Sequence, residues 1–476
     1  MNQADYLSHD ALGLAGLIRT EAVSAAEVLE AALARADTVN SRINAITMSM
    51  ADNARAAVRN GAPAGPLGGV PFLLKDLGAQ VAGLPTSAGS RLLAPVVAQA
   101  DSAIVTAYRN GGLVTIGKTN TPEFGLEPVT EPKLFGACRN PWDLGRTSGG
   151  SSGGAAAAVA AGIVPAAHAS DGGGSIRIPA ACCGLFGLKP SRGRVSFAPA
   201  NEGWGGFSIQ HAVTRSVRDS AALLDMVCTP RPGDPYWATP PATPYLDEVS
   251  RNPGRLKIGF VTGGINVPSI DPECAEGVLN AARLCQSLGH SVFEAKLAWD
   301  YPRVQAAAGV IVAASIAATI DNEAWRRGRS VDADEVEDLT WSLYEHGRSI
   351  PAATYIQALQ IAHAFGRAAA RSFEDFDILL LSTLGSPAVP VGWLRAGGLD
   401  AHADRLFSFM PNTQPFNVSG QPAMSVPLAV SHDGLPIGIQ FVARAGEEAI
   451  LFRLAGQLEK ASPWASRGPP STAKAG

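Results

Sequence analysis

The sequence predicts an α/β fold in which helices cover both faces of a central β-sheet. Short apolar runs that suit buried strands alternate along the chain with longer segments of helical periodicity. The run Ile378-Leu379-Leu380-Leu381 is apolar at every position, as a strand buried on both faces should be. With 46% hydrophobic and 17% charged residues among 476, the composition fits a folded chain and excludes a disordered one.

Local patterns predict the individual elements in chain order. Ser24 and Glu27 have the spacing of a capping box, which predicts a helix whose apolar stripe runs through 28–36. Residues 113–116 are rich in β-branched side chains and predict a strand. The same reasoning predicts, in order, an apolar run ending at 75–76, a helix at 103–110, a helix at 155–161, a strand at 256–261, a helix at 272–288, a strand at 291–294, mostly helix from about 303 to 373, and a hairpin of 423–430 with 437–442. The proline-rich residues 229–255 are expected to form a surface connection.

Charge and cysteine content exclude several classes of protein. The chain has 38 Lys+Arg against 42 Asp+Glu and a net charge of −4, so it lacks the basic excess of a nucleic-acid-binding protein. Its 6 cysteines show neither CxxC nor Cys/His spacing, which argues against zinc and against a disulfide framework. Cys182 and Cys183 are neighbours and poorly placed to bridge each other. We expect buried, apolar cysteines and no metal site.

Targeting features are also absent from the sequence pattern. The N-terminal residues have no basic segment followed by an apolar run, so a secretory signal is not expected. The weakly polar stretches 155–169 and 306–320 are shorter than the roughly 18 residues that cross a bilayer. The sequence therefore predicts a cytoplasmic protein without a membrane or nucleic-acid partner. It leaves the oligomeric state open, a homo-oligomer included.

Two short motifs match patterns whose chemistry we do not expect here. Residues 112–119 satisfy the P-loop pattern, but the residues between its glycines favour an extended strand over a phosphate cradle. Residues 149–154 satisfy the nucleophile-elbow pattern GxSxG twice, yet residues 143–147 before them do not have a strand pattern. His168 lies in an apolar context that favours a hydrogen-bonded core histidine. A Ser-His-Asp esterase remains the weaker alternative.

Two glycine- and serine-rich clusters, 149–154 and 170–179, are the strongest functional signal. Consecutive backbone N–H groups in the second cluster could form an anion-binding concavity, which beside a serine would be an oxyanion hole. A tightly packed loop without function is the alternative. A serine nucleophile needs a base, and Lys75 between apolar residues is a candidate. Its pKa would have to fall by roughly 3 units, about 4 kcal/mol, which burial can supply; an ordinary surface lysine is the alternative.

The run 149–190, with its ending Ile178-Pro179 through Lys189-Pro190, resembles the amidase signature family. The segments 68–76, 117–123 and 415–422 are similar to family segments as well, so the resemblance covers nearly the whole chain. It implies the amidase signature fold, a central twisted mixed β-sheet covered by helices on both faces. It also implies one amidase domain over 1–476, with a signature core at about 65–225, a helical, substrate-covering region at about 300–373 and a disordered tail at about 467–476.

The resemblance implies a Ser–cis-Ser–Lys triad that hydrolyses amides without a metal or organic cofactor. Ser175 matches the acylated nucleophile, Ser151 the bridging serine after a cis peptide bond, and Lys75 the base. The N–H groups of Gly172, Gly173, Gly174 and Ser175 match the oxyanion hole, and Ser152, Asp171 and Arg177 match supporting residues. Two positions depart from the family, Ser170 where Thr is frequent and Gly172 where Thr or Ile is frequent. We expect Gly172 to loosen the hole or widen the pocket.

The substrate class is narrowed by further resemblance. Residues 130–146, 216–219 and 272–274 resemble hydrolases of nylon-type cyclic amide oligomers, and related members cleave aryl amides and carbamates. The family's geometry implies that Phe124, Gly125 and Leu126 line the acyl pocket, with Gly125 leaving room for a bulky group. Trp204 is expected on a mobile loop as a lid, or else packed on the surface. The alternative function is the glutaminase-type component of a tRNA-dependent amidotransferase, which acts with a tRNA-binding partner.

Overall fold

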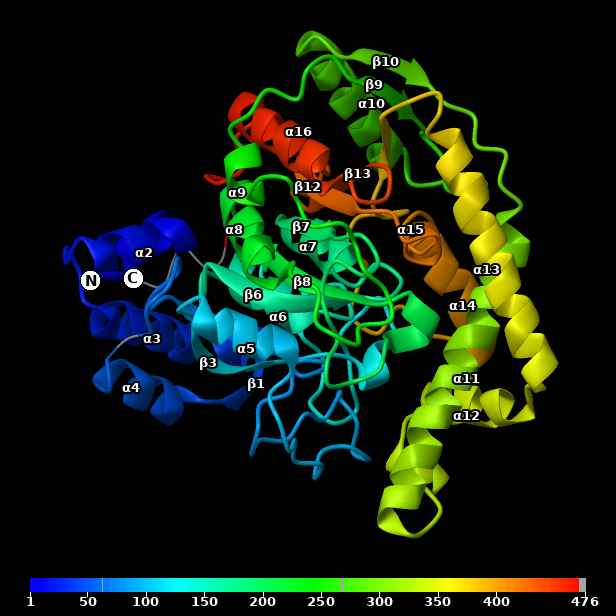
Figure 1. The fold of residues 1–476 in the computed structure, drawn as a ribbon, viewed down its shortest axis with the longest axis horizontal. Coiled ribbons are helices and arrows are strands. Elements are labelled where there is room, and N and C mark those ends of the chain that lie inside the picture. Colours follow the sequence, from blue (N-terminus) through cyan, green and yellow to red (C-terminus); the bar gives the residue numbers. More distant parts are fainter. Residues whose placement is uncertain (62, 266, 268, 471–476) are drawn as a thin grey trace.

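The computed structural model describes residues 1–61, 63–265, 267 and 269–470, and a mixed eleven-stranded sheet runs through its centre (Figure 1). The α/β fold expected from the sequence is therefore confirmed. From one edge to the other the strands are β1 (Ile46–Ser49), β3 (Val114–Thr119), β2 (Pro71–Lys75), β6 (Ala166–Asp171), β8 (Ile209–Thr214), β7 (Phe186–Lys189), β12 (Ala423–Val430), β13 (Pro436–Val442), β11 (Ile378–Ser382), β9 (Lys257–Phe260) and β10 (Ser291–Glu294).

Helices cover both faces of this sheet. One group, α6 (Gly153–Ala160) and α7 (Arg177–Cys183), packs together and against the central strands β6 and β7. A second group, α8 (Val217–Val227) and α16 (Glu448–Ala461), packs together and against β7 and β12. The main hydrophobic core contains residues from Tyr6 near the start to Trp464 near the end of the chain. The remaining helices are α1 (Gln3–Ser8), α2 (Ala11–Arg19), α3 (Ala25–Ile43), α4 (Ala51–Arg59), α5 (Ala103–Asn110), α9 (Tyr245–Glu248), α10 (Pro272–Ser287), α14 (Gly398–Phe409) and α15 (Pro415–Ser419), with the three described below.

The strand order brings the two ends of the predicted site together. β2 runs parallel to β6, and Leu73 pairs with Ala167. Parallel strands present their carboxyl ends at the same edge of a sheet. Lys75 at the end of β2 and Asp171 at the end of β6 therefore lie at one edge, although about a hundred residues separate them in sequence.

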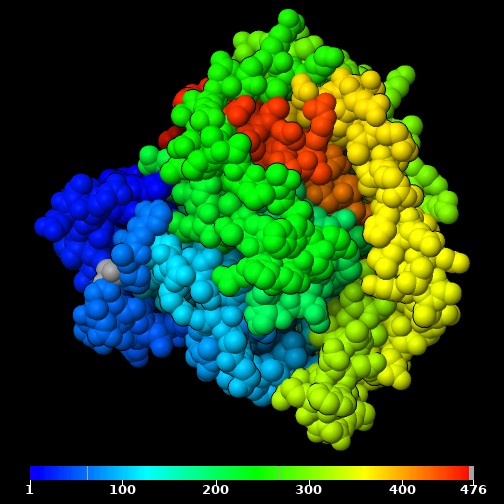
Figure 2. Space-filling view, in the orientation of Figure 1, coloured from blue at the N-terminus to red at the C-terminus, as the bar shows by residue number. Residues whose placement is uncertain are grey.

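A long helical arm covers one flank of the molecule. It consists of α11 (Tyr301–Arg327), α12 (Asp338–Ser349) and α13 (Ala352–Ser372), and α11 packs against both of the others. Figure 2 shows this arm in yellow and yellow-green, on the opposite flank from the blue N-terminal helices. In the described part of the chain, α11 is the one helix long and apolar enough to cross a membrane by length and composition, and 44% of its apolar window is buried inside the protein. It is longer than the stretch 306–320 singled out in the sequence.

Most predicted elements are confirmed, and one prediction needs correction. Residues 143–147 form strand β5 (Asp143–Thr147), which pairs with β4 (Arg139–Asn140) in a ribbon separate from the central sheet. Its side chains alternate between exposed and partly buried, so it lacks the apolar pattern of the central strands. The described part of the expected tail includes Arg467, which donates to the Pro427 carbonyl at 2.5 Å; residues 471–476 lie outside the described residues.

The P-loop pattern at 112–119 is a strand, as predicted. Its lysine, Lys118, is fully buried in β3. Lys118 Nζ lies 2.6 Å from Thr86 Oγ1 and 3.6 Å from Asp76 Oδ1, so this cation is already matched within the protein. The prediction of buried cysteines is also confirmed, since all 6 are buried and free.

Candidate active site

Lys75 is a buried amine held against two serine hydroxyls. It is the last residue of β2 and has no exposed surface. Its Nζ lies 2.7 Å from Ser151 Oγ and 3.0 Å from Ser170 Oγ. Burial lowers the pKa of Lys75 to about 7, against the opposing influence of the Asp171 carboxylate. A substantial fraction of this amine is therefore neutral near neutral pH and able to accept a proton.

Ser151 lies at the start of helix α6, after an irregular turn. The Gly150–Ser151 peptide bond is cis, as the family resemblance implies. A side chain on Gly150 would collide with the backbone of Glu127 and Val129, 2.6 Å from its Cβ. The chain can pass so closely only because this residue is a glycine. The turn leaves the Ser151 hydroxyl facing Lys75.

Ser175 lies on the loop between β6 and α7 and is 8% exposed. Its hydroxyl has no hydrogen-bond partner within the described part of the chain, and the structure does not join it to Ser151. The N–H groups of Gly172, Gly173 and Ser175 likewise have no acceptor among the described residues. A hydroxyl and neighbouring unpaired N–H groups on one loop are what a nucleophile and an oxyanion hole require.

Gly174 differs from the expectation that all four consecutive N–H groups are free. Its N–H donates to Asp171 Oδ1 at 2.7 Å. The residue has a φ of +139°, and a Cβ on it would lie 2.4 Å from Thr413 Oγ1. Gly174 is thus engaged in fixing the loop, and the N–H donors left for a ligand are those of Gly172, Gly173 and Ser175.

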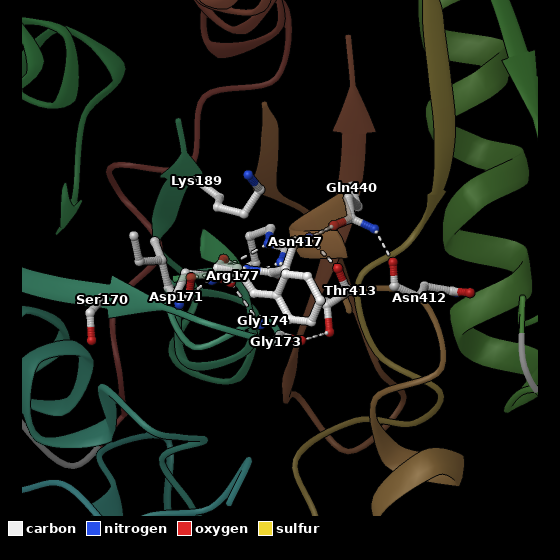
Figure 3. Close-up of polar contacts among 12 residues, drawn as sticks. Ser170, Asp171, Gly173, Gly174, Arg177, Lys189, Asn412, Thr413, Asn417 and Gln440 are labelled. Carbon is white, nitrogen blue, oxygen red and sulfur yellow. Dashed lines mark hydrogen bonds and ion pairs between the residues drawn. The ribbon is translucent and has the colours of Figure 1, made fainter. Parts of the chain in front are cut away.

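The predicted supporting residues Asp171 and Arg177 form a buried ion pair directly behind this loop (Figure 3). Arg177 Nη2 lies 2.9 Å from Asp171 Oδ1, and Nε lies 3.0 Å from Oδ2. Burial alone would raise the pKa of Asp171, but Arg177, Lys189 and Asn417 together bring it down to about 2. Asp171 is therefore a permanent carboxylate that also accepts from the N–H of Ile176 at 3.1 Å.

Three residues from the C-terminal part of the chain complete this network, and the sequence pattern does not single them out as site residues. Thr413 Oγ1 donates to the Gly173 carbonyl at 2.6 Å. Arg177 donates to Asn417 Oδ1 at 2.6 Å and to Gln440 Oε1 at 2.7 Å. Figure 3 shows these side chains converging on Arg177. They fix the oxyanion loop from the side away from the ligand.

A chamber of about 220 Å³ opens above Ser175 and Gly173. Gly125, Leu126 and Trp204 line it, as predicted. Most of its other side chains are apolar and come from the helical arm and from α14; they include Ile178, Val312, Leu339, Leu343, Leu406 and Met410. The chamber can therefore hold a small, largely apolar group against the Ser175 hydroxyl.

Comparisons with known proteins agree with this geometry. The family model "Amidase" matches residues 27–452. This chain belongs to the amidase family. It is 38% identical to the 6-aminohexanoate-cyclic-dimer hydrolase of Paenarthrobacter ureafaciens over 98% of both chains. The family and these relatives make it a hydrolase of carbon–nitrogen bonds other than peptide bonds.

Solved structures give the same answer for this amidase. It superposes on a 6-aminohexanoate cyclic dimer hydrolase with a TM-score of 0.92 and 37% identity, covering 98% of this chain and 99% of that one. A bacterial aryl acylamidase of the amidase signature family follows with a TM-score of 0.87 and 27% identity, at 96% and 97% coverage. The amidase-like component of the glutamyl-tRNA(Gln) amidotransferase of Thermotoga maritima is more distant, with a TM-score of 0.71 and 26% identity, at 97% and 95% coverage.

Two of the predicted substrate contacts in this amidase need correction. Phe124 packs into a hydrophobic cluster with Leu92 and Ile316 and does not line the chamber. Gly125 lines the chamber, but it does not leave an open space, because a Cβ on it would lie 2.7 Å from Leu77 Cδ2 and 3.1 Å from Ser151 Oγ. With a φ of +70°, Gly125 lets the chain approach the bridging serine closely.

Gly172 and Trp204 fit together. A Cβ on Gly172 would lie 2.7 Å from the Trp204 ring, so the family departure at position 172 makes room for this indole. Trp204 belongs to the short helix η2 (Gly203–Gly206) and adopts a positive φ of 53°. It packs against the arm cluster that contains Phe207 and Ile311. The predicted widening of the pocket at Gly172 is therefore wrong in this structure, because the indole fills the space.

Two further serines lie close to the Lys75 amine. Ser170 contributes the second hydroxyl at Lys75 Nζ, a contact that the sequence pattern does not reveal. Ser152, predicted as a supporting residue, bonds the backbone of Ser170, with its Oγ 3.1 Å from the carbonyl oxygen. The site serines are thus linked around one amine.

His168 is a core histidine in this amidase, as predicted. Its Nδ1 accepts from the Lys75 backbone N–H at 3.2 Å, and Nε2 lies 3.0 Å from Gln210 Oε1. Burial lowers its pKa to about 3, so it is neutral and structural. Among the residues that the structure describes, no group of three or more His, Cys, Asp or Glu could hold a metal ion.

Proposed function

We propose that this amidase cleaves small amides or carbamates through an acyl-enzyme on Ser175, with Ser151 and Lys75 as the proton relay. The observation that carries the proposal is the distance of 2.7 Å between Lys75 Nζ and Ser151 Oγ, for an amine whose pKa burial lowers to about 7. A dry, partly neutral lysine against a serine hydroxyl is a base ready for use.

The proposed reaction begins when neutral Lys75 accepts the proton of Ser151, and Ser151 accepts that of Ser175. Ser175 Oγ then attacks the carbonyl carbon, and the oxyanion is stabilised by the N–H groups of Gly172, Gly173 and Ser175. Ser151 returns a proton to the leaving nitrogen as the carbon–nitrogen bond breaks. Water, activated by the same relay, hydrolyses the ester. The Ser151–Ser175 hydrogen bond forms with substrate bound, since such bonds are often long in a ligand-free site.

The chamber supports an apolar acyl group as the preferred substrate. Its walls are mostly aliphatic and aromatic, and they would bind a polar glutamine side chain poorly. This disfavours the glutaminase-type alternative. Linear and cyclic amides, aryl amides and carbamates with small apolar bodies fit the lining. The proposed setting is cytoplasmic, with water as the second substrate.

A substrate panel tests the proposal. Purified wild type and Ser175→Ala are incubated with aryl amides, aryl carbamates, a cyclic amide dimer and glutamine, and amine release is measured. We expect turnover of at least one apolar amide or carbamate by wild type and none by Ser175→Ala. Full activity in Ser175→Ala would overturn the mechanism, and turnover of glutamine alone would overturn the substrate class.

A further inference from the structure

The apolar chamber contains one imidazole, that of His402 on helix α14. The His402 side chain is only 9% exposed, and it lines the same chamber as Ser175. A histidine among aliphatic side chains is costly to bury unless its ring nitrogens are satisfied. The partners of its two nitrogens therefore show what it can bind.

One nitrogen of His402 is fixed by a buried charge network. Nε2 lies 3.1 Å from Glu127 Oε1. Arg395 Nε lies 3.1 Å from each oxygen of the same carboxylate, and Arg395 Nη2 also reaches Glu337 Oε2 at 2.8 Å. Burial alone would raise the pKa of Glu127, but hydrogen bonds from His402 and Arg395 bring it below its usual value. Because Glu127 is ionised, Nε2 is the nitrogen that carries the proton.

The other nitrogen is left open toward the chamber. Nδ1 of His402 has no hydrogen-bond partner among the residues that the structure describes. In a neutral imidazole protonated at Nε2, Nδ1 carries a lone pair and acts as an acceptor. The other side-chain acceptors of the chamber are occupied apart from Ser175, since Gln414 Oε1 accepts from the Tyr301 hydroxyl at 3.1 Å. His402 Nδ1 can therefore accept a hydrogen bond from a ligand.

We propose that His402 Nδ1 accepts a hydrogen bond from a substrate N–H that does not belong to the bond being cleaved. The leaving nitrogen must face Ser151, which returns its proton, and Ser151 does not line the chamber with His402. His402 therefore selects amides or carbamates that carry a second N–H within an apolar body. This inference rests on the proposed function and adds to it the recognised group.

The test uses two substrates with the same scissile aryl amide, one bearing a second secondary amide and the other its N-methyl analogue, which lacks that N–H. We expect wild type to prefer the N–H substrate by about tenfold in kcat/KM, mainly through KM, because one hydrogen bond to a buried acceptor is lost. Equal kcat/KM values for the two substrates in wild type would overturn the proposal.

The decisive variant is His402→Gln, whose side-chain amide can still donate to Glu127 but offers no acceptor at the Nδ1 position. We expect its preference for the N–H substrate to fall to about onefold, while its kcat for the N-methyl analogue stays within a few-fold of wild type. The matched control is His432→Gln, the same change at a histidine whose side chain is 95% exposed, which should keep the wild-type preference. A full preference retained in His402→Gln would overturn the assignment.

Thermal unfolding separates recognition from folding. If His402→Gln melts at a much lower temperature than wild type, His402→Asn is compared as well, since it offers a polar atom near Nδ1 and loses the Glu127 contact. Recovery of the N–H preference in His402→Asn supports the proposal, and its loss contradicts it. Failure of the proposed function is distinguishable, because wild type would then cleave neither substrate.

Discussion

The catalytic floor and the apolar wall of the chamber are built in opposite ways. The floor comprises Lys75, Ser151 and the loop 170–177, where the Asp171–Arg177 pair is fully buried and hydrogen bonds fix the backbone. The wall comprises Leu339, Leu343, Leu406, Phe407 and Met410, whose side chains only pack. Directional bonds hold the floor rigid, whereas the wall can change shape at small cost. Chemistry should therefore depend on the floor and selectivity on the wall.

Within the floor, two buried lysines sharpen the same comparison. Burial lowers the pKa of both Lys75 and Lys189 to about 7. Lys189 Nζ donates to the Pro190 carbonyl at 2.8 Å, whereas Lys75 Nζ faces Ser151. Desolvation alone therefore does not make a base. The serine within reach of the amine does.

The largest expected effect is the loss of the base. Lys75→Met should lower kcat by about 10²- to 10⁴-fold, because no amine is left to accept the Ser151 proton. Lys189→Met removes the other buried amine and should keep kcat within about tenfold. Steady-state kinetics on an aryl amide measure both. Equal losses in the two variants would show that the distinction between the lysines is false.

Breaking the ion pair of the floor should cost stability as well as rate. Asp171→Asn leaves the buried Arg177 without its counterion, and such losses are about 3–5 kcal/mol in the free energy of unfolding. The conservative wall change Met410→Leu should cost less than about 1.5 kcal/mol. Urea unfolding followed by fluorescence compares them. A cost for Met410→Leu as large as that for Asp171→Asn would contradict the division into floor and wall.

The pH dependence of the rate reports the Lys75 amine. Only the neutral amine is active, so kcat/KM should rise as the pH increases through about 7 and then level off, falling about tenfold per unit on the acid side. Rates measured between pH 5 and 9 with a substrate that does not ionise give the profile. A rate that decreases from pH 6 to pH 8 would mean that the protonated form is the active one.

The smallest effect is expected on the cover of the chamber. Trp204→Ala removes an indole that lines the chamber and packs on Gly172. Its loss should raise KM for apolar substrates about tenfold through lost apolar contact, with kcat within a few-fold. Substrate saturation curves separate the two constants. A large fall in kcat with an unchanged KM would place Trp204 with the floor.

The sequence predicts the floor far better than the wall. Glycine and serine at 149–154 and 170–175 carry a local pattern, because close backbone approach permits few other residues. The network partners Thr413 and Gln440 and the chamber residue His402 lie more than two hundred residues away, in segments of ordinary composition. Only the strand order brings them to the loop. Strand β5 was missed because a polar, partly exposed ribbon lacks the apolar signal of the central strands.

Covalent trapping of the nucleophile tests the central claim most directly. Wild type is treated with an aryl sulfonyl fluoride or a slowly hydrolysed carbamate, and the modified peptide is identified by mass spectrometry. We predict one label, on Ser175, which is absent in Ser175→Ala and forms at least about a hundredfold more slowly in Lys75→Met. A label on Ser151 or on another residue, or unchanged labelling in Lys75→Met, would contradict the account.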